Sequence, residues 1–165
     1  MKPELFFPLD NPRIVTQKFG ENFRDYYGPG GHPGWDIVGT FGQEIRAAHN
    51  GMVTENKFSE TGTGWTLRVR HGEYGEFETL YGHMLDRSPF QVGNQVLCGK
   101  VIGKVGLTGL TTGAHLHCGL YQNGVPVDPA PYWNGMSAED YVSISNQLKI
   151  LAEKVGTLIK QLWGK

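Results

Sequence analysis

Glycine recurs throughout residues 13–131, and each short apolar segment between two glycines is only a few residues long. The chain contains 24 glycines without a collagen-like period, and they alternate with Val, Ile, Leu and Tyr. This spacing leaves no room for long helices, so it predicts many short strands joined by tight turns. The segment "GWTLRVRHG" has the two-residue period of a half-buried strand, with Trp65, Leu67 and Val69 on one face. Asn123-Gly124 indicates a two-residue hairpin. We therefore expect a mainly antiparallel β fold.

The pattern changes after residue 136, where glycine becomes rare. Ser137 is a suitable N-cap, and acidic residues follow in the first turn. We predict an amphipathic C-terminal helix of about twenty-five residues, and we divide the chain into a domain at 1–136 and this helix at 137–165. Packing on its own domain or self-association with a second copy is the favoured role, and lysines on the polar face also allow contact with an anionic envelope surface. The apolar residues alternate at spacings of three and four: Tyr141, Ile144, Leu148, Leu151, Val155, Leu158 and Leu162.

The overall composition excludes several classes of partner. Lys and Arg number 15 against 16 Asp and Glu, so no net positive field favours nucleic acid. No apolar segment reaches the length of an integral membrane span, and the N-terminus lacks the pattern of a signal peptide. Cys98 and Cys118 are too few for a disulfide scaffold, and we expect two small buried side chains, with one disulfide left open.

Four of the six histidines lie in three short motifs: "GGHPGWD", "LYGHM" and "GAHLHCG". The strand period places His115 and His117 on one face, so both imidazoles can converge on one centre. Catalytic zinc sites take three ligands from His, Asp and Glu and leave a fourth position open, and this chain offers His32, Asp36 and the His-x-His pair. The other two histidines, His49 and His71, lie beside turn glycines and are expected to be solvated.

The motifs resemble those of the lysostaphin-like, or LytM-like, zinc endopeptidases, which cut peptide bonds in peptidoglycan. The resemblance runs from about Thr16 to Trp133. It implies an antiparallel β-sheet or β-sandwich of the duplicated hybrid motif type. The segments that carry it are "TQKFG", "HPGWD", "AAHNGMV", "LYGHM", "VGNQVLCGKVIGKVGLTGLTTGAHLHCGL" and "NGVPVDPAPYW".

The same resemblance implies a role for each polar residue. His32, Asp36 and His117 correspond to the ligands of a Zn²⁺ ion, and His83 and His115 correspond to two catalytic histidines that do not bind the metal. Either of the two can be the general base for a metal-activated water, and the other then supports the oxyanion. Tyr26 matches the position of a tyrosine that assists the oxyanion; an aromatic side chain lining the substrate groove is an equal interpretation.

The function implied is that of a zinc-dependent endopeptidase acting on peptidoglycan stem or cross-bridge peptides. The alternative is a non-catalytic LytM-like module that binds the cell wall or activates a hydrolase. Without a signal peptide, we expect a chain made in the cytoplasm that reaches the wall after release, as a bacteriophage endolysin or as part of a virion, or by secretion if the chain is a fragment. The bond that is cut stays open, as does the choice between His83 and His115.

Overall fold

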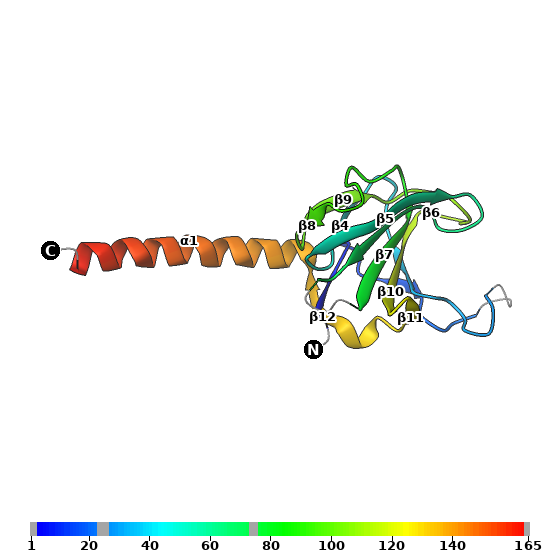
Figure 1. The fold of residues 1–165 in the computed structure, drawn as a ribbon, viewed down its shortest axis with the longest axis horizontal. Helices are drawn as coiled ribbons and strands as arrows, with labels where there is room; N and C mark the ends of the chain where they lie inside the picture. The colour runs from blue at the N-terminus through cyan, green and yellow to red at the C-terminus, as the bar shows by residue number, and fades with distance from the viewer. Residues whose placement is uncertain (1–2, 23–26, 73–75, 164–165) are drawn as a thin grey trace.

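The structure is a computed structural model of the chain, and it describes residues 3–22, 27–72 and 76–163. The body is made of strands and a short 3-10 helix, η2 (Ala130–Tyr132), and a long helix, α1 (Ala138–Trp163), follows it (Figure 1). The strands are β1 (Leu5–Phe7), β2 (Val15–Gln17), β3 (Trp35–Val38), β4 (Glu44–Arg46), β5 (Gly51–Ser59), β6 (Gly64–Arg70), β7 (Phe77–Met84), β8 (Gln95–Val96), β9 (Val101–Lys104), β10 (His115–Gln122), β11 (Val125–Val127) and β12 (Trp133–Ser137).

One large antiparallel sheet dominates the body. Its strands follow the order β2-β3-β10-β7-β6-β5-β8, and β11 pairs with β10. Two smaller pairs complete the body: β4 with β9, which is antiparallel, and β1 with β12, which is parallel. The prediction of a mainly antiparallel β fold with one C-terminal helix is confirmed.

Local sequence explains the strands and turns that were expected. In β6, Leu67 and Val69 are fully buried, as the two-residue period predicts. Between β10 and β11, Asn123 and Gly124 both have positive φ, 51° and 79°, which is the backbone of a type I′ turn. The predicted hairpin is therefore confirmed. It lies at the far end of β10 from the paired histidines.

The apolar core lies against the large sheet and is closed by β1, β4 and β9. Cys118 belongs to this core, Cys98 is buried in a smaller cluster near β1, and both thiols are free. The expectation of two small buried cysteine side chains is confirmed. The fully buried large side chains of the core are Leu5, Leu9, Ile37, Ile45, Leu67, Tyr81, Met84, Ile102, Leu116 and Leu120.

His71 departs from the sequence prediction. It was expected to be solvated, but its side chain is fully buried at the end of β6, where Nδ1 lies 2.9 Å from the carbonyl oxygen of Asn50. Burial is the main cause that lowers the pKa of His71 to about 4, and the contact with Asn50 only partly opposes it. The expectation was wrong because the His71 side chain points into the body, although Gly72 beside it is exposed.

Helix α1 begins with the predicted cap. The Ser137 hydroxyl accepts a hydrogen bond from the Asp140 amide at 3.0 Å, and the Asp140 carboxylate accepts one from the Ser137 amide at 3.3 Å. The guanidinium of Arg13 forms an ion pair with Asp140 at 2.6 Å. These contacts join the first turn of the helix to the body.

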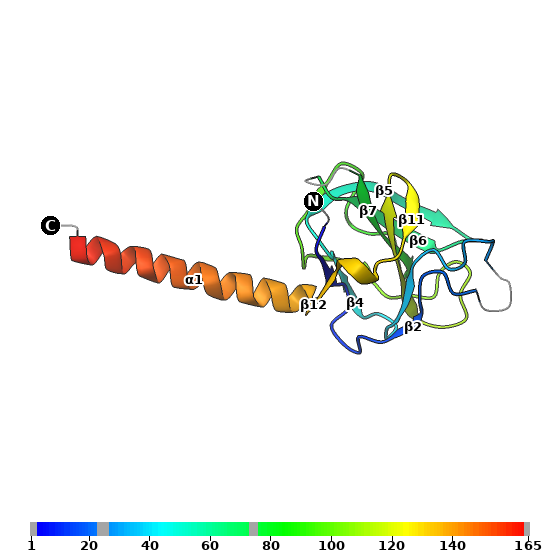
Figure 2. The same cartoon turned by 90° about the horizontal axis from the view of Figure 1, so that it is seen from below.

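The rest of α1 extends away from the body (Figures 1 and 2). Packing on its own domain, one of the expected roles of this helix, is therefore limited to the first turn, and the other expected roles, self-association and contact with an envelope surface, stay predictions. The physical reason is geometric: β12 ends at the edge of the body and α1 continues outward from it. The division of the chain into 1–136 and 137–165 stays a prediction. Among the described residues, no helix combines the length and apolar character that crossing a bilayer requires.

Candidate metal centre and active site

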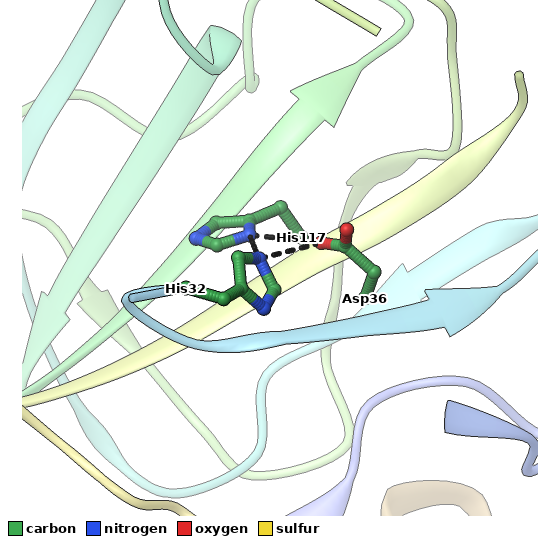
Figure 3. A group of neighbouring side chains, drawn as sticks. All are labelled: His32, Asp36 and His117. Carbon is green, nitrogen blue, oxygen red and sulfur yellow. Dashed lines mark hydrogen bonds and ion pairs between the residues drawn. The ribbon is translucent and has the colours of Figure 1, made fainter. Parts of the chain in front are cut away.

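Three polar side chains from different parts of the chain meet at one point (Figure 3). His32 comes from the loop before β3, Asp36 from β3, and His117 from β10, where its backbone is paired with that of Asp36. His32 Nε2 lies 3.2 Å from Asp36 Oδ1, His117 Nδ1 lies 3.0 Å from the same oxygen, and the two nitrogens are 3.0 Å apart. The His32 and His117 side chains are buried.

Gly34 explains why this loop can approach β10 so closely. A Cβ atom at this position would lie 2.7 Å from the carbonyl oxygen of Cys118, so any other residue would push the loop away from the strand. The "HPGWD" motif therefore has a structural requirement at its centre and polar side chains at its ends. This arrangement brings His32 over the strand that carries His117.

The three donor atoms fit a metal ion. A tetrahedral zinc site with bonds of about 2.0–2.1 Å separates neighbouring ligand atoms by about 3.3 Å, close to the separations observed here. His32 Nδ1 lies 3.3 Å from the carbonyl oxygen of Lys18, which can accept a hydrogen bond from Nδ1–H. The electron pair of Nε2 is then available to bind a metal. Without a cation, two imidazole nitrogens would face each other beside one carboxylate oxygen. The structure brings the three predicted ligands together, and their role in binding a metal stays a prediction.

His83 lies at the end of β7 in a strained backbone conformation. Its φ of 56° is in the left-handed region that non-glycine residues rarely adopt. Three contacts hold it there: its amide donates to Thr63 at 2.6 Å, its carbonyl accepts from Gly106 at 2.9 Å, and Nδ1 lies 2.8 Å from the carbonyl oxygen of Thr108. Such over-determined strain is typical of functional sites.

His115 lies next to His83 and also faces Asp36. The two rings have centroids 4.6 Å apart, and His115 Nε2 is 3.4 Å from Asp36 Oδ1. Nδ1 of His115 is 2.9 Å from the carbonyl oxygen of Gly113, so this carbonyl can orient the ring. Both histidines of the His-x-His pair therefore point to the same side of β10, as the strand period predicts.

Burial and hydrogen bonding move the pKa values of these groups in different directions. Burial alone would raise the pKa of Asp36, but contacts with His115, His117 and His32 outweigh it and hold that pKa well below its usual range. Burial lowers the pKa of His83 to about 4, although the Thr108 carbonyl opposes the shift. Burial is the largest single influence on His115 and acts to lower its pKa, but the hydrogen bond to Asp36, the charge of Asp36 and the Gly113 carbonyl together outweigh it and raise that pKa. His83 is thus held neutral near pH 7, whereas His115 binds a proton more readily.

A cleft of about 760 Å³ opens over these side chains. Tyr27 lines it, and its ring centroid is 5.1 Å from that of His32. Tyr26, the predicted oxyanion residue, lies outside the described residues, so its role stays a prediction. The remaining lining side chains are mostly uncharged: Gln17, Pro33, Thr61, Thr63, Leu110, Thr111 and Thr112.

Sequence reasoning missed the residues that support the histidines. Thr108 is the clearest example, because its carbonyl contacts His83 while its hydroxyl donates to Met84 at 2.6 Å and accepts from the Trp65 amide at 3.0 Å. The available signal was the glycine- and threonine-rich stretch 106–113, which lies between the motifs that carry His83 and His115.

Two histidines and one carboxylate, open to a cleft that holds two further histidines, are typical of a catalytic metal site rather than a closed structural one. Comparison with known proteins agrees with a catalytic rather than a structural site. The model of peptidase family M23 matches residues 30–129, and the chain belongs to this family.

Individual relatives and solved structures are similar to the same region. The DD-carboxypeptidase/endopeptidase Mpg of Neisseria meningitidis is 42% identical over 98 residues, which are 59% of this chain and 22% of that protein. The catalytic domain of the prophage-encoded M23 protein EnpA from Enterococcus faecalis, in a mutant form, has a TM-score of 0.65 at 29% identity and covers 77% of this chain and 97% of that one. The catalytic domain of lysostaphin from Staphylococcus simulans has a TM-score of 0.65 at 27% identity, with 73% and 91% covered. The chain thus spans only a small part of the curated relative, but nearly the whole of each catalytic domain.

Proposed function

We propose that this protein is a zinc-dependent endopeptidase that hydrolyses peptide bonds in peptidoglycan stem or cross-bridge peptides. The observation that carries the proposal is the convergence of His32, Asp36 and His117 in a cleft that also holds His83 and His115. Membership of peptidase family M23 supports the substrate class, as does a similarity of 30% identity to the peptidoglycan DD-endopeptidase ShyC of Vibrio cholerae. Action on the wall after release, as an endolysin or on a virion, is part of this proposal.

In this proposal His32, Asp36 and His117 hold the zinc ion. A zinc ion held there would supply Lewis-acid chemistry: it would polarise the scissile carbonyl and lower the pKa of a water molecule, so that this water loses a proton more easily near neutral pH. The buried His32 and His117 side chains keep solvent from one side of the centre. The low pKa of Asp36 keeps its carboxylate ionised, as a metal ligand must be.

The two remaining histidines divide the proton chemistry. If His83 Nδ1 donates to Thr108, its Nε2 is unprotonated near pH 7 and can accept the proton of the attacking water. His115 Nε2 faces the same centre, and when it carries a proton it can donate a hydrogen bond to the developing oxyanion and then transfer that proton to the leaving amine. Pairs of groups whose surroundings separate their pKa values commonly divide the acid and base roles in this way.

The test is mass spectrometry of the fragments released from purified peptidoglycans with defined glycine-bridge or direct cross-links. We expect new amino and carboxyl termini at a single type of peptide bond. We also expect His83→Ala and His115→Ala to fold and bind zinc but to release fragments at least about a hundredfold more slowly. Stoichiometric zinc without any cleavage of any wall type would contradict the enzyme and favour a non-catalytic wall-binding module.

A further inference from the structure

Beyond its first turn, the part of helix α1 whose side chains the structure describes is not packed against the body of the protein. Its fixed part is the first turn, where the Tyr141 ring packs on Phe6 with centroids 4.3 Å apart and Val142 lies against Gly99. From Ser143 to Gln161, none of the described side chains is buried. Leu148 and Leu151 are 61% and 57% exposed, the values of side chains that point straight into solvent.

The exposed side chains are sorted by chemistry around the helix axis. At about 100° per residue, the apolar ones fall within a sector of about 120°. Lys149, Glu153, Lys154 and Lys160 all lie outside this sector. Within the described part of α1, Ile150 is the one large exposed apolar side chain on the polar side. We call the apolar sector the open face of α1, and its members are Ile144, Leu148, Leu151, Ala152, Val155, Leu158 and Ile159.

The residues that flank the open face do not fit a paired coiled coil. If Leu148 and Leu151 are the a and d positions, the flanking e and g positions are where charged residues usually select a partner helix. Of these e and g positions only Lys154 is charged, and Ala152 and Ile159 are apolar. The two apolar residues make the open face wider than the narrow seam between two paired helices. A second copy of the chain therefore finds no complementary charges. These e and g positions are Ser145, Gln147, Ala152, Lys154, Ile159 and Gln161.

The charge of the helix is complementary to an anionic surface. Beyond the first turn, the described part of α1 carries three lysines and one glutamate. Among the described residues, none of these lysines forms an ion pair, so their ammonium groups are available. A cationic polar side together with a wide apolar sector is the pattern of helices that lie in the interface of a bilayer. Because α1 does not have the character of a spanning helix, it would lie on the membrane rather than cross it.

We propose that α1, from Ser143 to Gln161, binds the surface of an anionic lipid bilayer with its open face in the boundary between headgroups and acyl chains. The cleft stays accessible in this arrangement, because the turn that joins β5 to β6 and borders the cleft lies at the opposite end of the body from α1 (Figures 1 and 2). Lipid binding would hold the peptidase body beside the membrane. The inference concerns the helix alone and does not rest on the proposed peptidase activity.

The test is cosedimentation of the full-length protein with vesicles of phosphatidylcholine alone or with about a quarter phosphatidylglycerol. We expect about tenfold stronger partitioning into the anionic vesicles, decreasing with added salt. Leu148→Glu together with Leu151→Glu should abolish it. Asn146→Glu together with Gln161→Glu makes the same change in charge on the polar side, and this control should retain most of the binding.

Two results would overturn the proposal. One is partitioning that is absent, or that the two double variants reduce equally, because then the open face has no part in it. The other is a stable dimer or larger assembly in analytical ultracentrifugation that needs Leu148 and Leu151 while vesicles bind no protein. Circular dichroism of each variant, with and without vesicles, checks that the helix is retained.

Discussion

Replacing Thr108 with valine removes one hydroxyl group and leaves the shape of the side chain nearly unchanged. That hydroxyl donates to the Met84 carbonyl at 2.6 Å and accepts from the Trp65 amide at 3.0 Å, so it joins the loop after β9 to the end of β7 and the start of β6. Valine leaves both backbone groups without this partner in a half-buried position. At about 1–2 kcal/mol for each group, we expect a loss of about 3 kcal/mol in the free energy of unfolding.

The same substitution should reach the active site, because the Thr108 carbonyl lies 2.8 Å from His83 Nδ1. A shift of this loop would turn the His83 ring, and we expect the rate of peptidoglycan cleavage to fall by about tenfold while bound zinc stays unchanged. Thermal unfolding should show a midpoint lower by about 6–12 °C. Thr108→Ser keeps the hydroxyl and should restore most of the rate.

Thr40→Val is the control for stability, since Thr40 is exposed. A Thr108→Val protein with the midpoint and rate of the unchanged chain would refute the reasoning, because the hydroxyl would then hold nothing in place. A variant that loses stability but keeps its rate would show that the loop does not position His83.

Three further predictions concern other parts of the molecule. The pKa of His71 is lowered from 6.5 to about 4 in the folded state, so the unfolded chain takes up a proton at a higher pH than the folded one. The free energy of unfolding should therefore be highest above pH 6.5 and decrease as the pH falls toward 4. Urea titrations should show that the unchanged chain loses about 3 kcal/mol more of this free energy than His71→Asn over that range. Gly64→Ala should cost about 4 kcal/mol in denaturant titrations, because its Cβ would lie 2.3 Å from the backbone of Thr108. Gly124→Ala, with a similar φ and open space around it, should cost only about 1 kcal/mol. Removing metal with a chelator should abolish cleavage, and added Zn²⁺ should restore it.

Each of these has a result that would count against it. Equal pH dependence in the unchanged chain and His71→Asn would mean that this imidazole is not the group that titrates. Equal costs for the two glycine variants would mean that the contact with Thr108 is not tight. Full activity after complete removal of metal would exclude metal-assisted hydrolysis.

The candidate ligands and the two further histidines could be predicted from the sequence because they all lie in three short motifs. The period of β10 alone places His115 and His117 on one side, and "HPGWD" adds two further candidate ligands, a histidine and an aspartate, in one loop and strand. The pairing of Asp36 with His117 across β3 and β10 required the structure, since no local pattern specifies which strands are neighbours. The separate surroundings of His83 and His115 were hidden for the same reason.

His71 and Thr108 show where sequence reasoning stops. A histidine beside a turn glycine is usually solvated, and only the packing of β6 over the core shows that His71 is buried. Thr108 supports the site through its carbonyl and its hydroxyl. Neither contact changes the spacing of apolar residues, so sequence periodicity cannot predict it. For α1, the apolar spacing predicted the helix, but its direction away from the body depends on how β12 ends.

The zinc content of purified variants tests the central claim most directly. Measured by inductively coupled plasma mass spectrometry after dialysis, the unchanged chain should hold about one zinc ion per molecule. His117→Ala should lose the metal, whereas His115→Ala should keep it while losing activity. Zinc retained in His117→Ala, or lost equally from both variants, would contradict the assignment of His32, Asp36 and His117 as the metal ligands.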